Sequence, residues 1–447
     1  MSSSVKEKHT LFKGGVHPDD CKGASSCAAV KDAPLLEKYT VILHQNIGAR
    51  PELIVKKDDI LRKGQLLATP GGFVSVPVHS PTSGRVGALC EIPGPSGVKV
   101  QALEILSDGS DLPDNSLEPF PDWENQAPDI LKKRIADAGI VGMGGAAFPT
   151  HVKLSPPPDK KIDTLILNGA ECEPYLNADC RLMIERPEAV LEGAAIVARI
   201  LGVKNIFAGI EANKPEAIAA MKEKASKYNV NIVPLRVRYP QGGEKQLIYA
   251  VTGRKTPAGG LPMDVGCVVQ NVATTAAVME AVKEGKPLIE RITTVTGNAV
   301  VNPGNWRFRI GTPLSKALEL SGGVKYSPGK IILGGPMMGF AQKSLDVTLM
   351  KNSSGIVLLD RDEISLFSSQ ACIRCGRCID VCPMNILPGP LSVMVESEDF
   401  GLAEQYHAMD CIECGSCSYV CPSFRPLVQH FRRAKAEINA RRRKAKS

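Results

Sequence analysis

Two short runs of cysteines near the end of the chain have the spacing of iron–sulfur ligands. Each run reads C-x2-C-x2-C-x3-C-P, first in CIRCGRCIDVCP (372–383) and again in CIECGSCSYVCP (411–422). In this pattern the first three thiolates of a run bind one [4Fe–4S] cluster, and the fourth reaches the other cluster. The predicted ligands are Cys372, Cys375, Cys378 and Cys421 for one cluster, and Cys411, Cys414, Cys417 and Cys382 for the other.

A pair of structural zinc sites is the alternative for these cysteines. Zinc sites usually separate two C-x2-C pairs widely, whereas here four cysteines fall within eleven residues, twice. Pro383 and Pro422 would turn the chain away after the fourth ligand, and Gly376 and Gly415 would let the backbone lie close to the cluster sulfurs. The spacing therefore favours a two-cluster electron relay, which another part of the chain or a partner must supply with electrons.

The middle of the chain alternates between strand and helix patterns. This β-α-β-α-β order predicts a parallel sheet covered on both faces, with Asn213 as the cap of its third helix. A further helix is expected at 274–283. The expected helices are 130–138, 187–200 and 213–228, and the expected strands are 162–167, 205–210 and 231–237.

Four polar, mostly glycine-containing loops are expected to converge at the carboxyl edge of this sheet, where parallel sheets bind ligands. A glycine-rich loop can direct backbone N–H groups at a phosphate, and Lys153 adds a positive charge. The pattern predicts a nucleotide or flavin site. The four loops are GMGGAAFPTHVKL (142–154), NGAECEPYLNAD (168–179), YPQGGEKQLIY (239–249) and QNVATTAAV (270–278).

The remaining sequence divides into smaller modules. Short strands broken by glycine and proline predict an all-β module before the α/β block, and β character returns after it around one expected helix, 314–320. The segment 387–409 between the cysteine runs is expected to be helical. The predicted units are an N-terminal segment (1–37), a barrel-sandwich module (38–107), an α/β domain (120–286), a β-grasp-like module (288–345), a two-cluster ferredoxin-like domain (360–430) and a basic tail (431–447).

Composition limits the classes of protein. No apolar run reaches the roughly 18 residues of a membrane-spanning helix, and the N-terminus lacks an apolar signal core, so we expect a cytoplasmic chain. Eight of the 14 cysteines lie in the two runs, which favours metal ligation over disulfides. The whole net charge of +7 lies in residues 432–447, which argues against a general nucleic-acid surface. We expect this tail to be solvated and removable, with contact to an anionic membrane surface as the alternative.

The four loop motifs resemble those of the NADH- and FMN-binding flavoprotein subunit of respiratory complex I. The order of modules, together with FKGGVHP (12–18) and HSPTSGRV (79–86), is similar to the RnfC family of the Rnf electron-transport complex. The resemblance implies a peripheral subunit on the cytoplasmic side of the cell membrane. It would belong to an ion-translocating ferredoxin:NAD+ oxidoreductase and exchange electrons between NAD(H), FMN and two [4Fe–4S] clusters. Other subunits of the complex, including a ferredoxin-like iron–sulfur subunit, would be its partners.

The resemblance also implies roles for individual residues. Glu173 would be the catalytic group facing the dinucleotide, together with Glu244, and Phe148 would stack near the nicotinamide or the adenine. Gly142, Gly144 and Lys153 would hold the phosphate and ribityl oxygens of FMN, Asn168, Glu171 and Cys172 would contact the flavin ring, and Asn271 and Thr274 would flank the phosphate end. The chain departs from complex I at Met143, Ala170 and Gly243, where complex I has an arginine, an aspartate and a glutamate.

Two other functions fit parts of this pattern. One is a soluble cobalamin-reductase-type iron–sulfur flavoprotein, against which the N-terminal position of the β module argues. The other is a non-catalytic electron-transfer adaptor that has lost its flavin. The first β module is similar to lipoyl carriers, but its hairpin PGGFVSVP (70–77) has no lysine to carry a prosthetic group, so we expect a docking scaffold.

Overall fold

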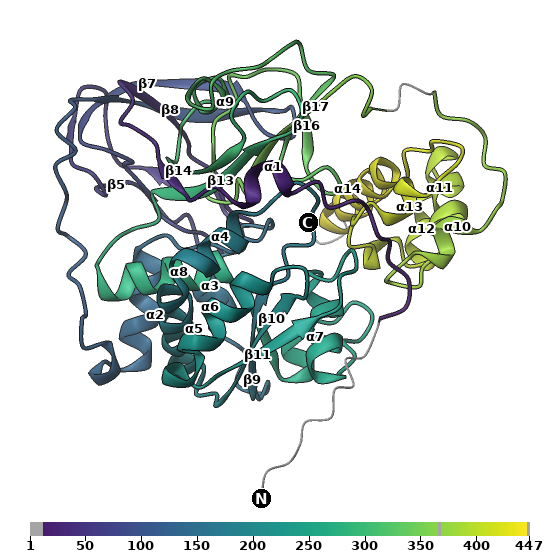
Figure 1. Ribbon diagram of the computed structural model, residues 1–447, viewed down its shortest axis with the longest axis horizontal. Helices are drawn as coiled ribbons and strands as arrows, with labels where there is room; N and C mark the ends of the chain where they lie inside the picture. The colour runs from purple at the N-terminus through teal and green to yellow at the C-terminus, as the bar shows by residue number, and fades with distance from the viewer. Residues whose placement is uncertain (1–11, 365–367, 445–447) are drawn as a thin grey trace, which may run out of the picture.

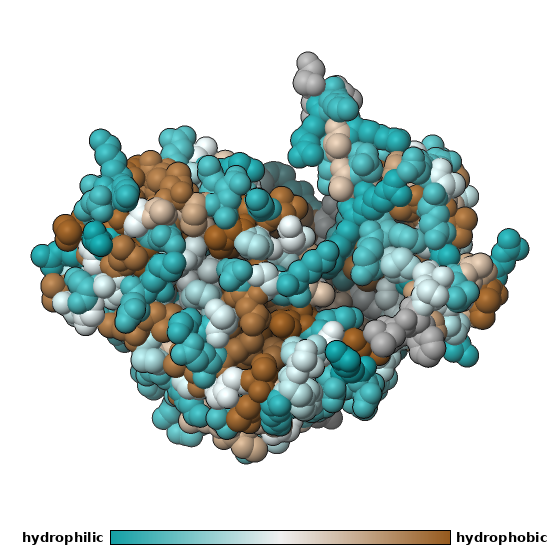
Figure 2. All heavy atoms as spheres, turned by 90° about the horizontal axis from the view of Figure 1, so that it is seen from above, coloured by the Kyte–Doolittle hydropathy of each residue, from teal (hydrophilic) through white to brown (hydrophobic). Residues whose placement is uncertain are grey.

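The computed structural model describes residues 12–364 and 368–444 (Figure 1). Figure 1 shows two β modules above an α/β domain, with a small helical domain of the C-terminal cysteines beside them. On the face seen in Figure 2, hydrophobic residues form several patches separated by hydrophilic ones. No helix within the described residues has the length and apolar character needed to span a membrane.

The α/β domain is built on a four-stranded parallel sheet, as the sequence predicts. The strand order is β11-β10-β9-β12. Helices α5 (Pro187–Leu201) and α8 (Val272–Lys283) pack so closely that a Cβ on Gly193 would lie 1.8 Å from the Thr275 carbonyl oxygen. The other elements are β9 (Thr164–Gly169), β10 (Asn205–Glu211), β11 (Val230–Leu235), β12 (Cys267–Asn271), α2 (Pro128–Asp137), α4 (Ala178–Glu185), α6 (Pro215–Ala225) and α7 (Glu244–Thr252).

The predicted cap of the third helix is wrong. Helix α6 begins after Lys214, and no side chain caps its first turn. The Asn213 side chain instead accepts a hydrogen bond of 3.1 Å from Lys214 Nζ, whose other acceptor is Glu211 Oε2, also at 3.1 Å. The buried Glu211–Lys214 pair therefore draws Asn213 away from the helix end.

The first β module contains strands alone, as expected, and it docks on the α/β domain. Buried Lys351 donates to the carbonyl oxygens of Pro77 (2.9 Å) and Gly139 (2.8 Å), and burial lowers its pKa to about 7. The hairpin tip contacts the glycine-rich loop region, where Phe73 O lies 3.0 Å from His151 Nε2. The sheets are β2-β8-β7-β4 and β3-β5-β6, with β2 (Lys38–Ile42), β3 (Glu52–Leu53), β4 (Ile60–Leu61), β5 (Leu66–Thr69), β6 (Val78–His79), β7 (Gly84–Pro93) and β8 (Lys99–Ser107).

The second β module is larger than predicted. Its six-stranded sheet has the order β1-β14-β13-β17-β15-β16 and includes the expected helix α9 (Leu314–Leu320). Strand β17 (Gly355–Leu359) lies beyond the predicted limit of 345 but is buried along its length, between β13 and β15. The other strands are β1 (Lys31–Asp32), β13 (Glu290–Thr296), β14 (Gly304–Arg309), β15 (Lys330–Leu333) and β16 (Phe340–Gln342).

The cysteine domain is helical, and its last helix includes the predicted tail. Helix α14 (Leu427–Lys444) buries Phe431, Ala434 and Ile438 against the rest of the domain. The expectation of a solvated, removable tail is therefore wrong for 431–444, because an apolar stripe at helical spacing lies between the basic residues. The segment between the runs forms α11 (Pro388–Glu396) and α12 (Phe400–Gln405), as predicted, and the runs contain α10 (Arg377–Asp380) and α13 (Ser416–Tyr419).

Candidate functional site

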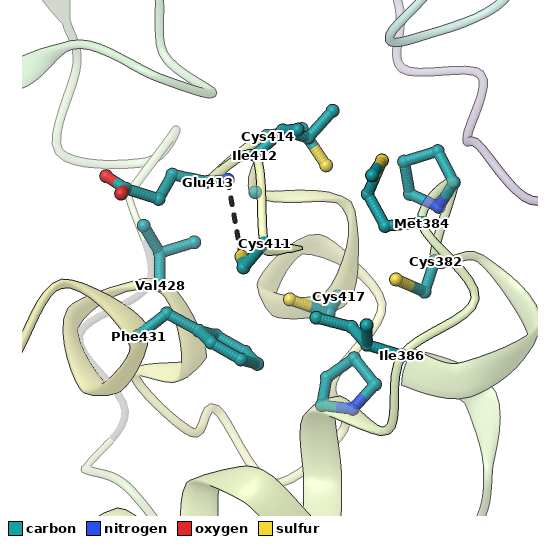
Figure 3. A pocket seen from close by; sticks show the side chains of 13 residues that line it. Cys382, Met384, Ile386, Cys411, Ile412, Glu413, Cys414, Cys417, Val428 and Phe431 are labelled. Atoms are coloured by element: carbon teal, nitrogen blue, oxygen red, sulfur yellow. Dashed lines mark hydrogen bonds between the residues drawn. The ribbon is translucent and has the colours of Figure 1, made fainter. Parts of the chain in front are cut away.

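Four cysteines from the two runs line one cavity in the cysteine domain (Figure 3). Cys411, Cys414 and Cys417 come from the second run, and Cys382 comes from the first. Cys382, Cys414 and Cys417 are each 7% exposed. The apolar side chains of Ile386, Val428 and Phe431 also line this cavity. This grouping of sulfurs is the one that the crossed ligand set requires.

The first run makes the other, more exposed group. The Sγ atoms of Cys378 and Cys372 lie 3.4 and 4.0 Å from the position that a Cβ on Gly389 would take. Cys375 is exposed, and Cys421 follows helix α13. The place of Cys421 in this ligand set stays a prediction.

The donor set fits clusters better than single zinc ions. A zinc ion holds its sulfurs at about 2.3 Å from one point. Among the described residues, no three His, Cys, Asp or Glu side chains converge in that way. Cys382, Cys411, Cys414 and Cys417 instead stand around a cavity, which suits a cube whose irons each bind a different thiolate.

At the carboxyl edge of the parallel sheet, two predicted site residues are neighbours. Asn168 at the end of β9 and Asn271 at the end of β12 are register partners. Asn168 Nδ2 donates to the Gly242 carbonyl at 2.8 Å, and Gly242 N donates to Cys172 Sγ at 3.4 Å. The loops that follow β9 and β11 are thereby joined, as the predicted convergence requires.

The glycine-rich loop lies over the start of helix α8. Met143 N donates to Thr274 Oγ1 at 2.8 Å, and a Cβ on Gly144 would lie 3.2 Å from Asn271 Cβ. Asn271 caps α8 by accepting from the Ala273 and Thr274 amides, and its Nδ2 donates to Asp179 at 2.6 Å. Thus Asn271 and Thr274 act first on the protein itself, by fixing the loop that is predicted to hold FMN.

Lys153 and Glu244 form an ion pair. Lys153 ends the short helix α3 (Thr150–Lys153), and Glu244 begins α7. Lys153 Nζ lies 2.9 Å from Glu244 Oε1 and donates to the Val269 carbonyl at 3.0 Å. The predicted phosphate ligand and the predicted dinucleotide ligand therefore neutralise each other.

The two acidic residues of the next loop diverge. Glu171 accepts from the Asp179 and Cys180 amides (2.8 and 3.0 Å) at the start of α4. Glu173 leaves this group and accepts from the Met337 and Met338 amides (3.1 and 2.8 Å) of the loop after β15. Burial raises the pKa of Glu173 to about 7, against the lowering effect of these two N–H donors.

The nucleotide edge contacts the cavity of Cys382, Cys411, Cys414 and Cys417 directly. The Tyr239 hydroxyl donates to the Cys414 carbonyl oxygen at 2.6 Å, and Gln246 Nε2 donates to the Pro383 carbonyl at 3.3 Å. Gly15 N donates to the Val381 carbonyl at 2.8 Å. These contacts place the second-run cysteines next to the predicted flavin loops.

Comparison with known proteins identifies the family of this arrangement. The chain is 48% identical over 438 residues to the RnfC-type subunit of the proton-translocating ferredoxin:NAD(+) oxidoreductase complex of Clostridium ljungdahlii, covering 97% of this chain and 96% of the relative. It is 45% identical to the corresponding subunit of the Na(+)-translocating complex of Acetobacterium woodii, covering 98% and 99%. The chain belongs to the RnfC family.

Four family models match successive parts of this RnfC chain. They are described as an RnfC barrel sandwich hybrid domain (10–110), a Nuo51 FMN-binding domain (135–280), an SLBB domain (292–341) and a 4Fe-4S dicluster domain (365–439). The mixed α/β layout predicted from the sequence agrees with them. The corresponding subunit of the ion-translocating oxidoreductase complex of Rhodobacter capsulatus is 44% identical, covering 96% of this chain and 83% of the relative.

A solved structure shares the fold. A chain of an NAD+-reducing [NiFe]-hydrogenase in the H2-reduced state superposes with a TM-score of 0.50 at 19% identity, covering 74% of this RnfC chain and 70% of that chain. The likeness extends the shared fold over most of the chain.

No sequence motif points to Arg291, which the structure brings to the glycine-rich loop of this RnfC chain. Its guanidinium is buried, donates to the carbonyls of Met143 (2.9 Å) and Lys351 (3.1 Å), and faces Asp179 and Glu171. Its Nε has no partner among the described residues. Arg291 comes from β13 of the other module, so local spacing could not have marked it.

The departures from complex I are also explained by packing. Met143 and Ala170 are 4% and 0% exposed and belong to two apolar cores. A Cβ on Gly243 would lie 2.5 Å from Gln246 Oε1. The exposed glycine-rich loop, the buried cation of Arg291 and the amides of Asn168 and Asn271 still provide a polar setting that fits FMN.

Proposed function

We propose that the chain is the NAD(H)-handling subunit of an Rnf-type ferredoxin:NAD+ oxidoreductase. In this role it exchanges electrons between NAD(H), FMN and two [4Fe–4S] clusters, as the enzyme subunit of an ion-translocating complex. Its place is peripheral, on the cytoplasmic side of the membrane, and its partners are the other subunits of the complex. The names of relatives that are 45–48% identical over nearly their whole length support this role.

One observation carries the proposal. The loop 239–243 contacts predicted flavin residues on one side and a predicted cluster ligand on the other. Gly242 is hydrogen bonded to Asn168 and Cys172, and Tyr239 to Cys414. A flavin held by the sheet edge would lie next to the second-run cysteines, which is the arrangement that a chain of electron carriers needs.

FMN, when bound, converts between the two-electron hydride chemistry of NAD(H) and the one-electron chemistry of iron–sulfur clusters. Gly142 and Gly144 would present backbone N–H groups to its phosphate, and Lys153 would add charge once it leaves Glu244. Asn168 and Cys172 would contact the ring from the end of β9. Phe148 and Glu244 would orient the dinucleotide, and Glu171 would hold the loop by capping α4.

Glu173 is proposed to act on the nicotinamide side while the second β module holds it. Its carboxylate accepts from two backbone amides, so its position is fixed in the protein. With a pKa raised to about 7 by burial, it can gain or lose a proton near neutral pH.

The decisive experiment is an anaerobic NADH titration of the reconstituted protein. We expect a flavin absorption peak above a broad iron–sulfur shoulder, about eight irons per chain, and bleaching of both features by NADH. A shoulder without a flavin peak would instead support the flavin-free adaptor. A flavin that NADH does not bleach would contradict the proposed NAD(H) role.

A further inference from the structure

The two cysteine runs form copies of the same loop in different surroundings. Arg374 and Glu413 occupy equivalent positions, each with φ +56, and Gly376 and Gly415 follow with φ +80 and +82. The matching left-handed conformations show that both runs fold the same way around their ligand sets. Differences in their environment can therefore be compared position by position.

The second loop uses its surface to dock the rest of this chain. The Cys414 carbonyl accepts from Tyr239, and a Cβ on Gly415 would lie 2.7 Å from the Met337 carbonyl oxygen. Glu413 forms ion pairs with Arg432 (3.0 Å) and Lys435 (2.8 Å) of α14. Three successive positions of this loop are thus in contact with other elements.

The equivalent surface of the first loop is uncovered. Cys375 is exposed, and no atom lies within 4 Å of a Cβ placed on Gly376. Ile373 is 67% exposed, whereas its equivalent Ile412 is half-buried. The side chains of Arg374 and Arg377 have no ion pair or hydrogen bond among the described residues.

We propose that the surface formed by Ile373, Arg374, Cys375, Gly376 and Arg377, here called the first-run surface, docks a second redox protein with an acidic surface. The proposal rests on the proposed function. The second loop shows how this backbone carries a contact to a neighbouring redox module, and the first loop repeats that backbone around an exposed cluster ligand.

The charge of the first-run surface identifies the chemistry of the partner. In the docked loop, acidic Glu413 meets two basic residues. The equivalent residue of the open loop is basic Arg374, and Arg377 adds a second positive charge where the docked loop has fully buried Ser416. Complementary charge therefore requires acidic groups around an apolar contact for Ile373. Such redox contacts are small and transient, in keeping with the size of this surface.

The test uses the protein with flavin and both clusters, and an acidic two-[4Fe–4S] ferredoxin as the probe. Binding is measured anaerobically by biolayer interferometry at several salt concentrations. The variant R374E/R377E is compared with K56E/K57E, which makes the same change in net charge on exposed residues of the first β module. Ile373→Ser tests the apolar contact, and it serves as the second variant if charge reversal damages the nearby cluster.

We expect R374E/R377E to bind the ferredoxin at least about tenfold more weakly than K56E/K57E. The parent should lose affinity with rising salt, and R374E/R377E should lose that dependence. Ile373→Ser should weaken binding at all salt concentrations.

Equal binding by R374E/R377E and K56E/K57E, or no binding by the parent at low salt, would overturn the proposal. So would a loss in R374E/R377E of flotation with phosphatidylglycerol vesicles, or of self-association in size-exclusion chromatography, with ferredoxin binding intact. NADH bleaching of flavin and clusters should stay normal in these variants. A parent without NADH bleaching would contradict the proposed function instead, independently of the binding result.

Discussion

The Tyr239 hydroxyl donates a 2.6 Å hydrogen bond to the carbonyl oxygen of Cys414. It joins the loop after strand β11 to a predicted cluster ligand. Tyr239→Phe keeps the ring but leaves this buried carbonyl without its donor, at a cost of about 1–2 kcal/mol. We expect the contact to open about tenfold more often, so that an iron chelator removes the adjacent cluster correspondingly faster. Tyr249→Phe on α7 is the control, and equal rates of iron loss in both variants would contradict this role of Tyr239.

Cys382 lines the cavity of the second-run cysteines, although it belongs to the first run. Cys382→Ala should therefore damage the cluster of Cys411, Cys414 and Cys417 and leave the other cluster intact. Electron paramagnetic resonance of the reduced protein distinguishes the two signals. Cys27→Ala, at an exposed thiol outside both runs, is the control. Loss of the Cys372 cluster signal in Cys382→Ala would show that the ligand sets are not crossed.

The Lys153–Glu244 pair gives opposite predictions for its two members. Lys153→Ala should weaken FMN binding by about tenfold, since a hydrogen bond to a charged group contributes roughly 1.5 kcal/mol or more. Glu244→Gln should tighten FMN binding by about twofold to fivefold, because Lys153 no longer has to leave a partly exposed ion pair. Fluorescence titration with FMN measures both. Weaker FMN binding in Glu244→Gln would contradict the proposed exchange of partners.

Glu173→Gln should keep FMN and both clusters but slow reduction of the flavin by NADH, as measured by stopped-flow absorbance. The variant also tests the pKa. Burial raises the pKa of Glu173 from an ordinary value of about 4.3 to about 7 in the folded protein. A raised carboxyl pKa stabilises the fold most in acid, and this contribution is lost as the pH rises through about 7.

The parent's free energy of unfolding, relative to that of Glu173→Gln, should therefore fall between about pH 4 and about pH 7 and level off above. Urea denaturation at several pH values measures it, with the exposed Glu284→Gln as the control. A constant difference between the parent and Glu173→Gln across this range would contradict a titrating Glu173.

Two truncations separate the structural part of helix α14 from its basic end. Removing residues 432–447 deletes Ala434 and Ile438 from the core, together with Arg432 and Lys435, which hold Glu413 beside Cys414. We expect this truncation to lose iron, whereas removal of 441–447 alone should leave about eight irons per chain. Iron analysis after anaerobic reconstitution measures both. Full iron content in the longer truncation would restore the removable tail that the sequence predicts.

Local patterns allowed much of the fold to be predicted. Helix α9 begins and ends where the sequence places it, and the parallel strands of the α/β domain lie where buried apolar runs alternate with helical ones. Missed features involve contacts between distant segments. Strand β17 joins a sheet whose other strands precede it by many residues, and Asn213 is drawn from its cap by Glu211 and Lys214.

The sequence by itself determined the chemistry of the site, since the spacing of cysteines within each run fixes which thiolates a short loop can present together. It also identified the loops at the sheet edge, because a strand's last residues must lie there. Only the tertiary structure decided that the second-run cysteines adjoin Tyr239, that Lys153 is paired with Glu244, and that Glu173 is held by the second β module. The physical reason is that such contacts join modules far apart in the chain, and neither residue spacing nor periodicity records how separate modules pack.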